Sequence, residues 1–89
     1  MKAVISVTGK DSTGIVAKVS AKCAEYEANI TEISQSTIDG YFVMIMLVDI
    51  DRLKIGFSDF VDAMSKLGKE SGLIINTMHG QIFDSVHKI

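Results

Sequence analysis

The stretch ITEISQSTIDGYFVMIMLVDI, from Ile30 to Ile50, gives the clearest structural signal in this chain. At its centre stands Asp39-Gly40, a dipeptide typical of a two-residue β-hairpin turn. The residues before the turn are polar and alternate with isoleucine, whereas the residues after it are almost all apolar. The stretch therefore predicts two antiparallel strands, 30–38 and 41–50, of which the first is suited to the edge of a sheet.

Each side of this hairpin carries one further strand and one helix. Residues before it alternate as in a strand and then change to helical spacing, and residues after it show the same two patterns in reverse order. We expect Gly72 to end the second helix and Asn29 to end the first helix in a left-handed turn. The remaining predicted elements are strands at Lys2–Thr8 and Leu73–Met78, helices at Gly14–Glu27 and Gly56–Ser71, and a short terminal helix at about 80–89.

This element order predicts a single α+β domain over residues 1–89, a ferredoxin-like βαββαβ sandwich. The four strands form an antiparallel sheet in the order 4-1-3-2. Right-handed crossovers place the two main helices on one face of that sheet, and the short C-terminal helix follows.

The strand after the turn is apolar on both faces, although two helices cover only one. Residues 42, 44, 46 and 48 are apolar, and so are residues 41, 43, 45 and 47. A sheet with one wet face should alternate apolar and polar residues. We expect the second face to be covered by a second copy of the chain or by the C-terminal segment, and we favour a homodimer. The alternative is that a central strand tolerates exposed valine and isoleucine.

Composition argues against several functions. The net charge is −2, with nine basic and eleven acidic residues, and no basic run suggests nucleic-acid binding. The single Cys23 excludes an internal disulfide and a cysteine-only metal cage, and it fits a cytoplasmic location. The longest apolar run, 41–48, is too short to span a membrane. We therefore expect no nucleic-acid or membrane partner and no cofactor.

The loop between the first strand and the first helix is the candidate ligand site. It reads VTGKDSTGIV, Val7–Val16, and it matches neither the P-loop nor the dinucleotide-binding pattern. The helix amides at about 14–16 would face a carboxylate, and Asp11 could accept hydrogen bonds from an ammonium group. Such a loop suits a small zwitterion. The alternative is a tight turn without a ligand, in which Asp11, Ser12 or Thr13 caps the helix.

An enzyme is the least favoured interpretation. Cys23, His79 and His87 are scattered, and Cys23 falls on the apolar stripe of the first helix. We expect Cys23 to be a buried thiol and both histidines to be exposed. Catalysis needs a nucleophile, a base and a group that stabilises charge, and no such constellation is evident.

The stretch from Val7 to Ser36 resembles the opening of an ACT domain, a small amino-acid-sensing regulatory module. Six positions match its G-x-D-x-x-G-I loop and its Asn-Ile pair. With its tail IFDSVHKI, the chain is similar to small stand-alone ACT proteins of bacteria and archaea. One departure is Thr13, where many ACT loops carry proline. The matching residues are Gly9, Asp11, Gly14, Ile15, Asn29 and Ile30.

The resemblance implies paired subunits that bind an effector between the first loop of one subunit and the second strand of its neighbour. It implies a non-enzymatic regulatory or sensor protein whose partners are a small amino acid or related metabolite, a second copy of the chain and possible separate effector proteins. The alternative is a ligand-free dimerisation module. The expected ligand-binding residues are Gly9, Asp11, Ser12, Thr13, Gly14, Ile15, Asn29 and Ile30.

Overall fold

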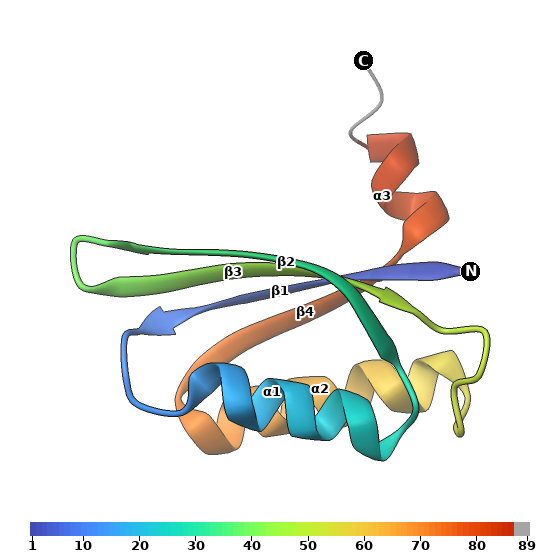
Figure 1. Cartoon of the computed structure of the whole chain (residues 1–89), viewed down its shortest axis with the longest axis horizontal. Helices are drawn as coiled ribbons and strands as arrows, with labels where there is room; N and C mark the ends of the chain where they lie inside the picture. The colour runs from blue at the N-terminus through green and yellow to red at the C-terminus, as the bar shows by residue number, and fades with distance from the viewer. Residues whose placement is uncertain (87–89) are drawn as a thin grey trace.

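The protein is described by a computed structural model covering residues 1–86 (Figure 1). Four strands and three helices follow one another in the predicted order, with β2 and β3 consecutive. Their bounds are β1 (Lys2–Lys10), α1 (Ile15–Glu25), β2 (Asn29–Ile38), β3 (Tyr41–Asp49), α2 (Phe57–Ser71), β4 (Leu73–His79) and α3 (Gly80–Val86). The last part of the expected terminal helix, 87–89 with His87, lies outside the described residues.

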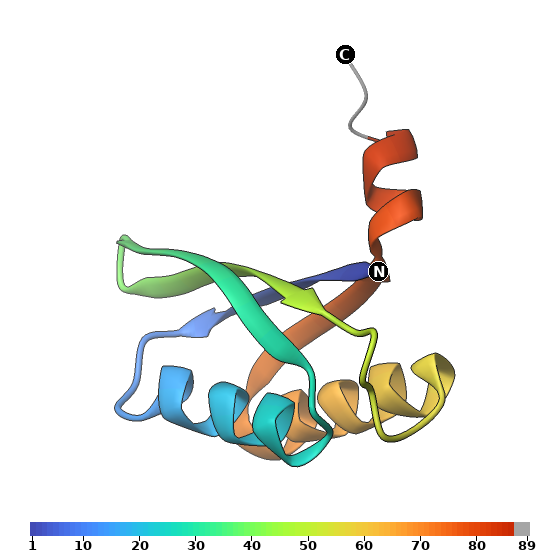
Figure 2. The same ribbon diagram turned by 45° about the vertical axis from the view of Figure 1, so that its right-hand side comes forward.

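The four strands form one antiparallel sheet in the order β2-β3-β1-β4, which confirms the predicted 4-1-3-2 order. Helices α1 and α2 lie side by side on one face of this sheet (Figure 1). Helix α3 rises from the other side, at the end of the sheet where β1 begins (Figures 1 and 2). The fold is therefore the expected α+β ferredoxin-like sandwich, with an extra helix on the opposite side of the sheet from α1 and α2.

The core fills the space between the sheet and the two long helices. Alternate residues of β1 and β3 point into it, as the sequence pattern predicts. Helix α1 contributes Val19 and Cys23, and α2 contributes Phe60 and Met64. The ring of Phe60 meets Tyr26 edge to face at a centroid distance of 6.2 Å. The sheet side of the core consists chiefly of Ala3, Ile5, Val7, Phe42, Met44, Met46, Val48, Leu73 and Ile75.

The start of α1 differs from the expected one. Gly14, not Asp11, Ser12 or Thr13, occupies the N-cap position, and within the described chain no side chain forms a capping hydrogen bond there. Gly14 has φ 85°, a left-handed conformation that glycine adopts at little cost. The chain thus enters the helix through a turn of the backbone itself, which leaves the three polar side chains of the loop exposed.

The end of α1 also differs. The helix ends at Glu25, and Glu27 rather than Asn29 takes the left-handed conformation, with φ 58°. The amide of Ala28 donates to the carbonyl of Cys23 at 2.9 Å, and Ala28 is buried. Because the chain must turn early to bury Ala28, Asn29 is already the first residue of β2.

The two predicted glycine turns are confirmed. Asp39 and Gly40 have φ 50° and 80°, the positive pair that a type I′ hairpin requires. Gly72 caps α2 with φ 70°, and its amide donates to the carbonyl of Gly68.

The second face of the sheet remains open. Tyr41, Ile45 and Ile74 are 54%, 45% and 65% exposed on it. Helix α3 begins at Gly80, whose Cα lies so close to β1 that an added Cβ would stand 2.7 Å from the carbonyl oxygen of Lys2. The helix then points away from the sheet (Figure 2). Over its described length α3 therefore leaves Tyr41, Ile45 and Ile74 exposed, whereas Val4 on the same face is only 6% exposed.

Candidate functional site

The expected loop site lies at one end of the sheet, beside the hairpin turn. Gly9 is still part of β1, opposite Phe42 and Leu73. A Cβ at Gly9 would stand 2.7 Å from Leu73 Cδ2, so this glycine allows close packing of β4. The amide of Asp11 donates to the carbonyl of Gly40 at 3.0 Å, which ties the loop to the β2–β3 turn.

The loop residues can reach a ligand from outside. Asp11, Ser12, Thr13 and Gly14 are exposed, whereas Ile15 is buried and anchors the first turn of α1. Around Gly14 there is open space, since an added Cβ would meet no atom within 4 Å. The first turn of α1 carries no acidic residue, so no carboxylate of that turn offsets the partial positive charge of its free amides.

Asn29 and Ile30 lie at the opposite end of the molecule. Asn29 pairs with Asp49, whereas Gly9 pairs with Phe42 of the same strand, seven residues away. At the usual rise per strand residue, this separation is roughly 23 Å. A single chain therefore does not bring the two groups of expected site residues together.

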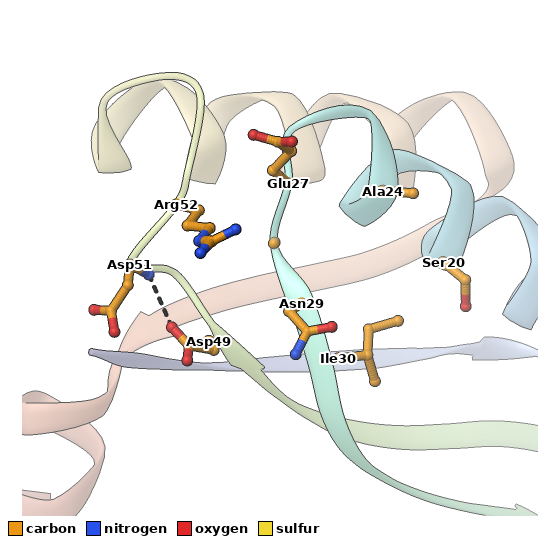
Figure 3. Close-up of a pocket in the computed structure, with 9 residues that line it drawn as sticks. Ser20, Ala24, Glu27, Asn29, Ile30, Asp49, Asp51 and Arg52 are labelled. Carbon is orange, nitrogen blue, oxygen red and sulfur yellow. Dashed lines mark hydrogen bonds between the residues drawn. The ribbon is translucent and has the colours of Figure 1, made fainter.

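A pocket of about 660 Å³ surrounds Asn29 and Ile30 (Figure 3). It lies where α1 ends, β2 begins and β3 ends. Arg52 reaches from the loop after β3 toward the start of β2 (Figure 3). The other residues that line the pocket are Ser20, Ala24, Glu27, Ala28, Asp49 and Asp51.

Arg52 and the acidic residues of this pocket were not among the expected site residues. These residues reach the pocket because β3 ends beside the start of β2. The available signal was the polar segment Asp49–Arg52 directly after an apolar strand. An arginine guanidinium and an asparagine amide are suited to hydrogen-bond a carboxylate.

Two of the three carboxylates that line the pocket, Asp49 and Asp51, form local bonds. Asp49 Oδ1 accepts a hydrogen bond from the Asp51 amide at 2.9 Å, and Asp51 forms an ion pair with the amino terminus. The hydrogen bond and the charge of that ammonium lower the pKa of Asp51, and Asp49 contributes less. The negative charge of Asp51 is thus matched within the chain, while Arg52 extends over the pocket.

The two other described candidate groups, Cys23 and His79, are buried to different degrees. Cys23 is fully buried, and burial raises the pKa of its thiol to about 11. His79 is half-buried rather than exposed: its Nδ1 accepts from the Gln81 amide at 3.2 Å and its ring meets Phe57. Among residues 1–86, no three side chains of the His, Cys, Asp and Glu types gather as a metal site. No helix of this part of the chain is long and apolar enough to cross a membrane.

A family model and an individual relative both match most of this chain. Residues 2–77 match the family model described as an ACT domain. The UPF0237 protein of Methanocaldococcus jannaschii is 44% identical over 88 residues, which are 99% of this chain and 98% of that protein.

Two solved structures show how the fold is used elsewhere. An ACT domain protein from Streptococcus pneumoniae superimposes with a TM-score of 0.84 and 42% identity, covering 94% of each chain. A formyltetrahydrofolate deformylase from Pseudomonas syringae superimposes with a TM-score of 0.79 and 27% identity, but the similarity covers 88% of this chain and only 27% of the deformylase. In that larger enzyme, this fold is one part among others.

Proposed function

Because this chain belongs to the ACT domain family, we propose that it is a non-enzymatic regulatory protein that binds a small amino acid or a related metabolite between two subunits. The ligand-binding residues are Asn29 and Ile30 in one subunit and, in the loop of its neighbour, Gly9, Asp11, Ser12, Thr13, Gly14 and Ile15. Arg52 joins them from the pocket.

The observation that carries this proposal is the free edge of β2. From Thr31 to Ile38 every residue of this strand is exposed, and its outer edge faces no other strand of the sheet. When two β2 edges pair antiparallel, the start of one strand lies beside the end of the other. The partner subunit's Asn29 then lies beside Ile38, and Ile38 is near the loop because Asp11 is bonded to Gly40.

The joined site offers complementary groups for a zwitterion. The first-turn amides of α1 attract the carboxylate, and Asp11 accepts hydrogen bonds from the ammonium group. The partner subunit's Asn29, Ile30 and Arg52 face the rest of the ligand. A ligand held this way stabilises one arrangement of the two subunits over others, and an effector protein responds to that shift in population.

A thermal-shift screen against the common amino acids tests this function. The melting temperature should rise with at least one of them, since ligand at a hundredfold excess over its Kd adds about 2.7 kcal/mol of stability. Asp11→Ala should abolish the shift without lowering the melting temperature of the free protein, because no cap bond depends on that side chain. The control, Asp62→Ala on the exposed side of α2, should retain the shift.

A mixing experiment tests whether two subunits share the site. Asp11→Ala and Asn29→Ala should each fail to bind alone. A mixed dimer of the two variants contains one site with both wild-type residues, so a randomly exchanged equimolar mixture should regain about a quarter of the wild-type binding sites measured by calorimetry. No recovery in a demonstrably mixed dimer contradicts the shared site. A stable dimer that no metabolite shifts supports the ligand-free dimerisation module instead.

A further inference from the structure

The open face of the sheet is an apolar surface of a kind rarely left bare in so small a protein. By the strand register, its centre is the outward row of β3, flanked by outward residues of the neighbouring strands. Ile45 and Ile74 are among the most exposed large apolar side chains in the described residues. The apolar residues on this face are Val4, Ile38, Tyr41, Val43, Ile45, Leu47, Ile74 and Met78.

The size of the face fits one partner of similar size. It extends along the longest and the shortest dimensions of the molecule, 34 and 19 Å (Figure 1). These dimensions correspond to a footprint of roughly 650 Å² per copy. In a standard stable interface each partner buries about 800 Å², which is a similar area. The side of α3 adds further contact area at one end.

Helix α3 restricts how a second copy could sit on this face. It stands on the open side of the sheet, at the end where β1 starts and β4 finishes (Figures 1 and 2). If two copies faced each other with the same ends together, their α3 helices would collide. With opposite ends together, each α3 stands beside the far end of the partner's sheet, where the hairpin turn lies.

The charges at the two ends support the same orientation. Lys10 lies on the outward row of β1 at the hairpin end. Glu32 and Asp49 lie on the outward rows of β2 and β3 at the α3 end, together with Lys2. Packing with opposite ends together brings Lys10 of each copy to the acidic residues of the other.

We propose that the open sheet face binds a second copy of this chain, face to face and with strand directions opposed about a two-fold axis near Ile45. This interface is separate from the β2 edge used in the proposed function. The two together would make an assembly of four chains, and the face alone a dimer.

Molar-mass measurement by light scattering tests the interface. Ile45→Glu should halve the mass of the wild-type assembly, and Ile74→Lys should do the same from another strand. Lys66→Glu is the control, because it introduces the same carboxylate at an exposed position of α2, on the opposite side of the sheet and away from β2. It should retain the full mass. Unchanged mass in both face variants, or an equal loss in the control, would overturn the proposal.

The same measurements separate this proposal from the ligand site. Ile45→Glu should lose half of its mass and retain the thermal shift with the amino acid that shifts the wild type. Asp11→Ala should lose the thermal shift and retain the mass. Each proposal can therefore fail without the other.

Cross-linking tests the orientation, and buried Cys23 leaves an introduced cysteine as the reactive thiol. A mixture of Lys10→Cys and Asp49→Cys chains should cross-link with a short bis-maleimide into a heterodimer, and Lys10→Cys alone should stay largely uncoupled. Efficient coupling of Lys10→Cys to itself would show that like ends meet, which contradicts the proposed orientation.

Discussion

Burial controls the chemistry of single residues in this protein more than residue type does. Cys23 lies on the apolar stripe of α1, fully buried among core side chains. Desolvation disfavours its charged form, which raises the pKa of the thiol from 9.0 to about 11. The helix stripe in the sequence predicted this environment. In contrast, Asp11, Ser12 and Thr13 were expected as helix caps, and Gly14 occupies that position, because the path of the backbone rather than side-chain preference shapes the turn.

The pKa of Cys23 predicts how stability depends on pH. The unfolded chain loses the thiol proton near pH 9 and the folded chain near pH 11. This contribution to stability is therefore complete below pH 9 and is lost as the pH rises through 11, by at most about 3 kcal/mol. Urea unfolding of the wild type and of Cys23→Ala should give profiles that converge over this range. Parallel profiles would contradict the prediction.

At the scale of elements, α2 and β4 approach each other closely at one glycine. A Cβ at Gly68 would stand 2.7 Å from the carbonyl oxygen of Leu73 and 3.1 Å from Ile75 Cγ1. Glycine normally weakens a helix interior by about 1 kcal/mol relative to alanine. Here the helix keeps it because the strand backbone occupies the space of a side chain. No local sequence pattern indicates this, since the contact joins the end of α2 to the strand that follows the turn.

Gly68→Ala should therefore destabilise the protein, although alanine favours helices. We expect a loss of about 1–3 kcal/mol in the free energy of unfolding, typical of overpacking. Lys66→Ala, at an exposed position of the same helix, is the control and should change stability by no more than about 0.5 kcal/mol. The free energies come from urea titrations monitored by circular dichroism. A Gly68→Ala protein as stable as the control would show that β4 can move enough to accommodate the added methyl group without a loss of stability.

The whole molecule has one covered and one open sheet face, so its stability should depend on association. A partner that binds only the folded chain raises the melting temperature in proportion to the logarithm of concentration. Calorimetry over a hundredfold range of protein concentration should show a rising melting temperature for the wild type. In Ile45→Glu the rise should be smaller. Equal slopes for the two proteins would count against the open face as an interface.

The amino-acid sequence was enough to predict the element order, the hairpin at Asp39-Gly40, the strand order and the apolar second face. The elements, the hairpin and the apolar face follow from signals within a few residues of one another, and the strand order follows from the element order through the crossover rule. The tertiary structure was needed to show that Arg52 joins Asn29 at one pocket and that α3 stands on the open side of the sheet. Those arrangements depend on how distant segments meet in space, because strand register and helix packing are set by contacts between residues far apart in the chain.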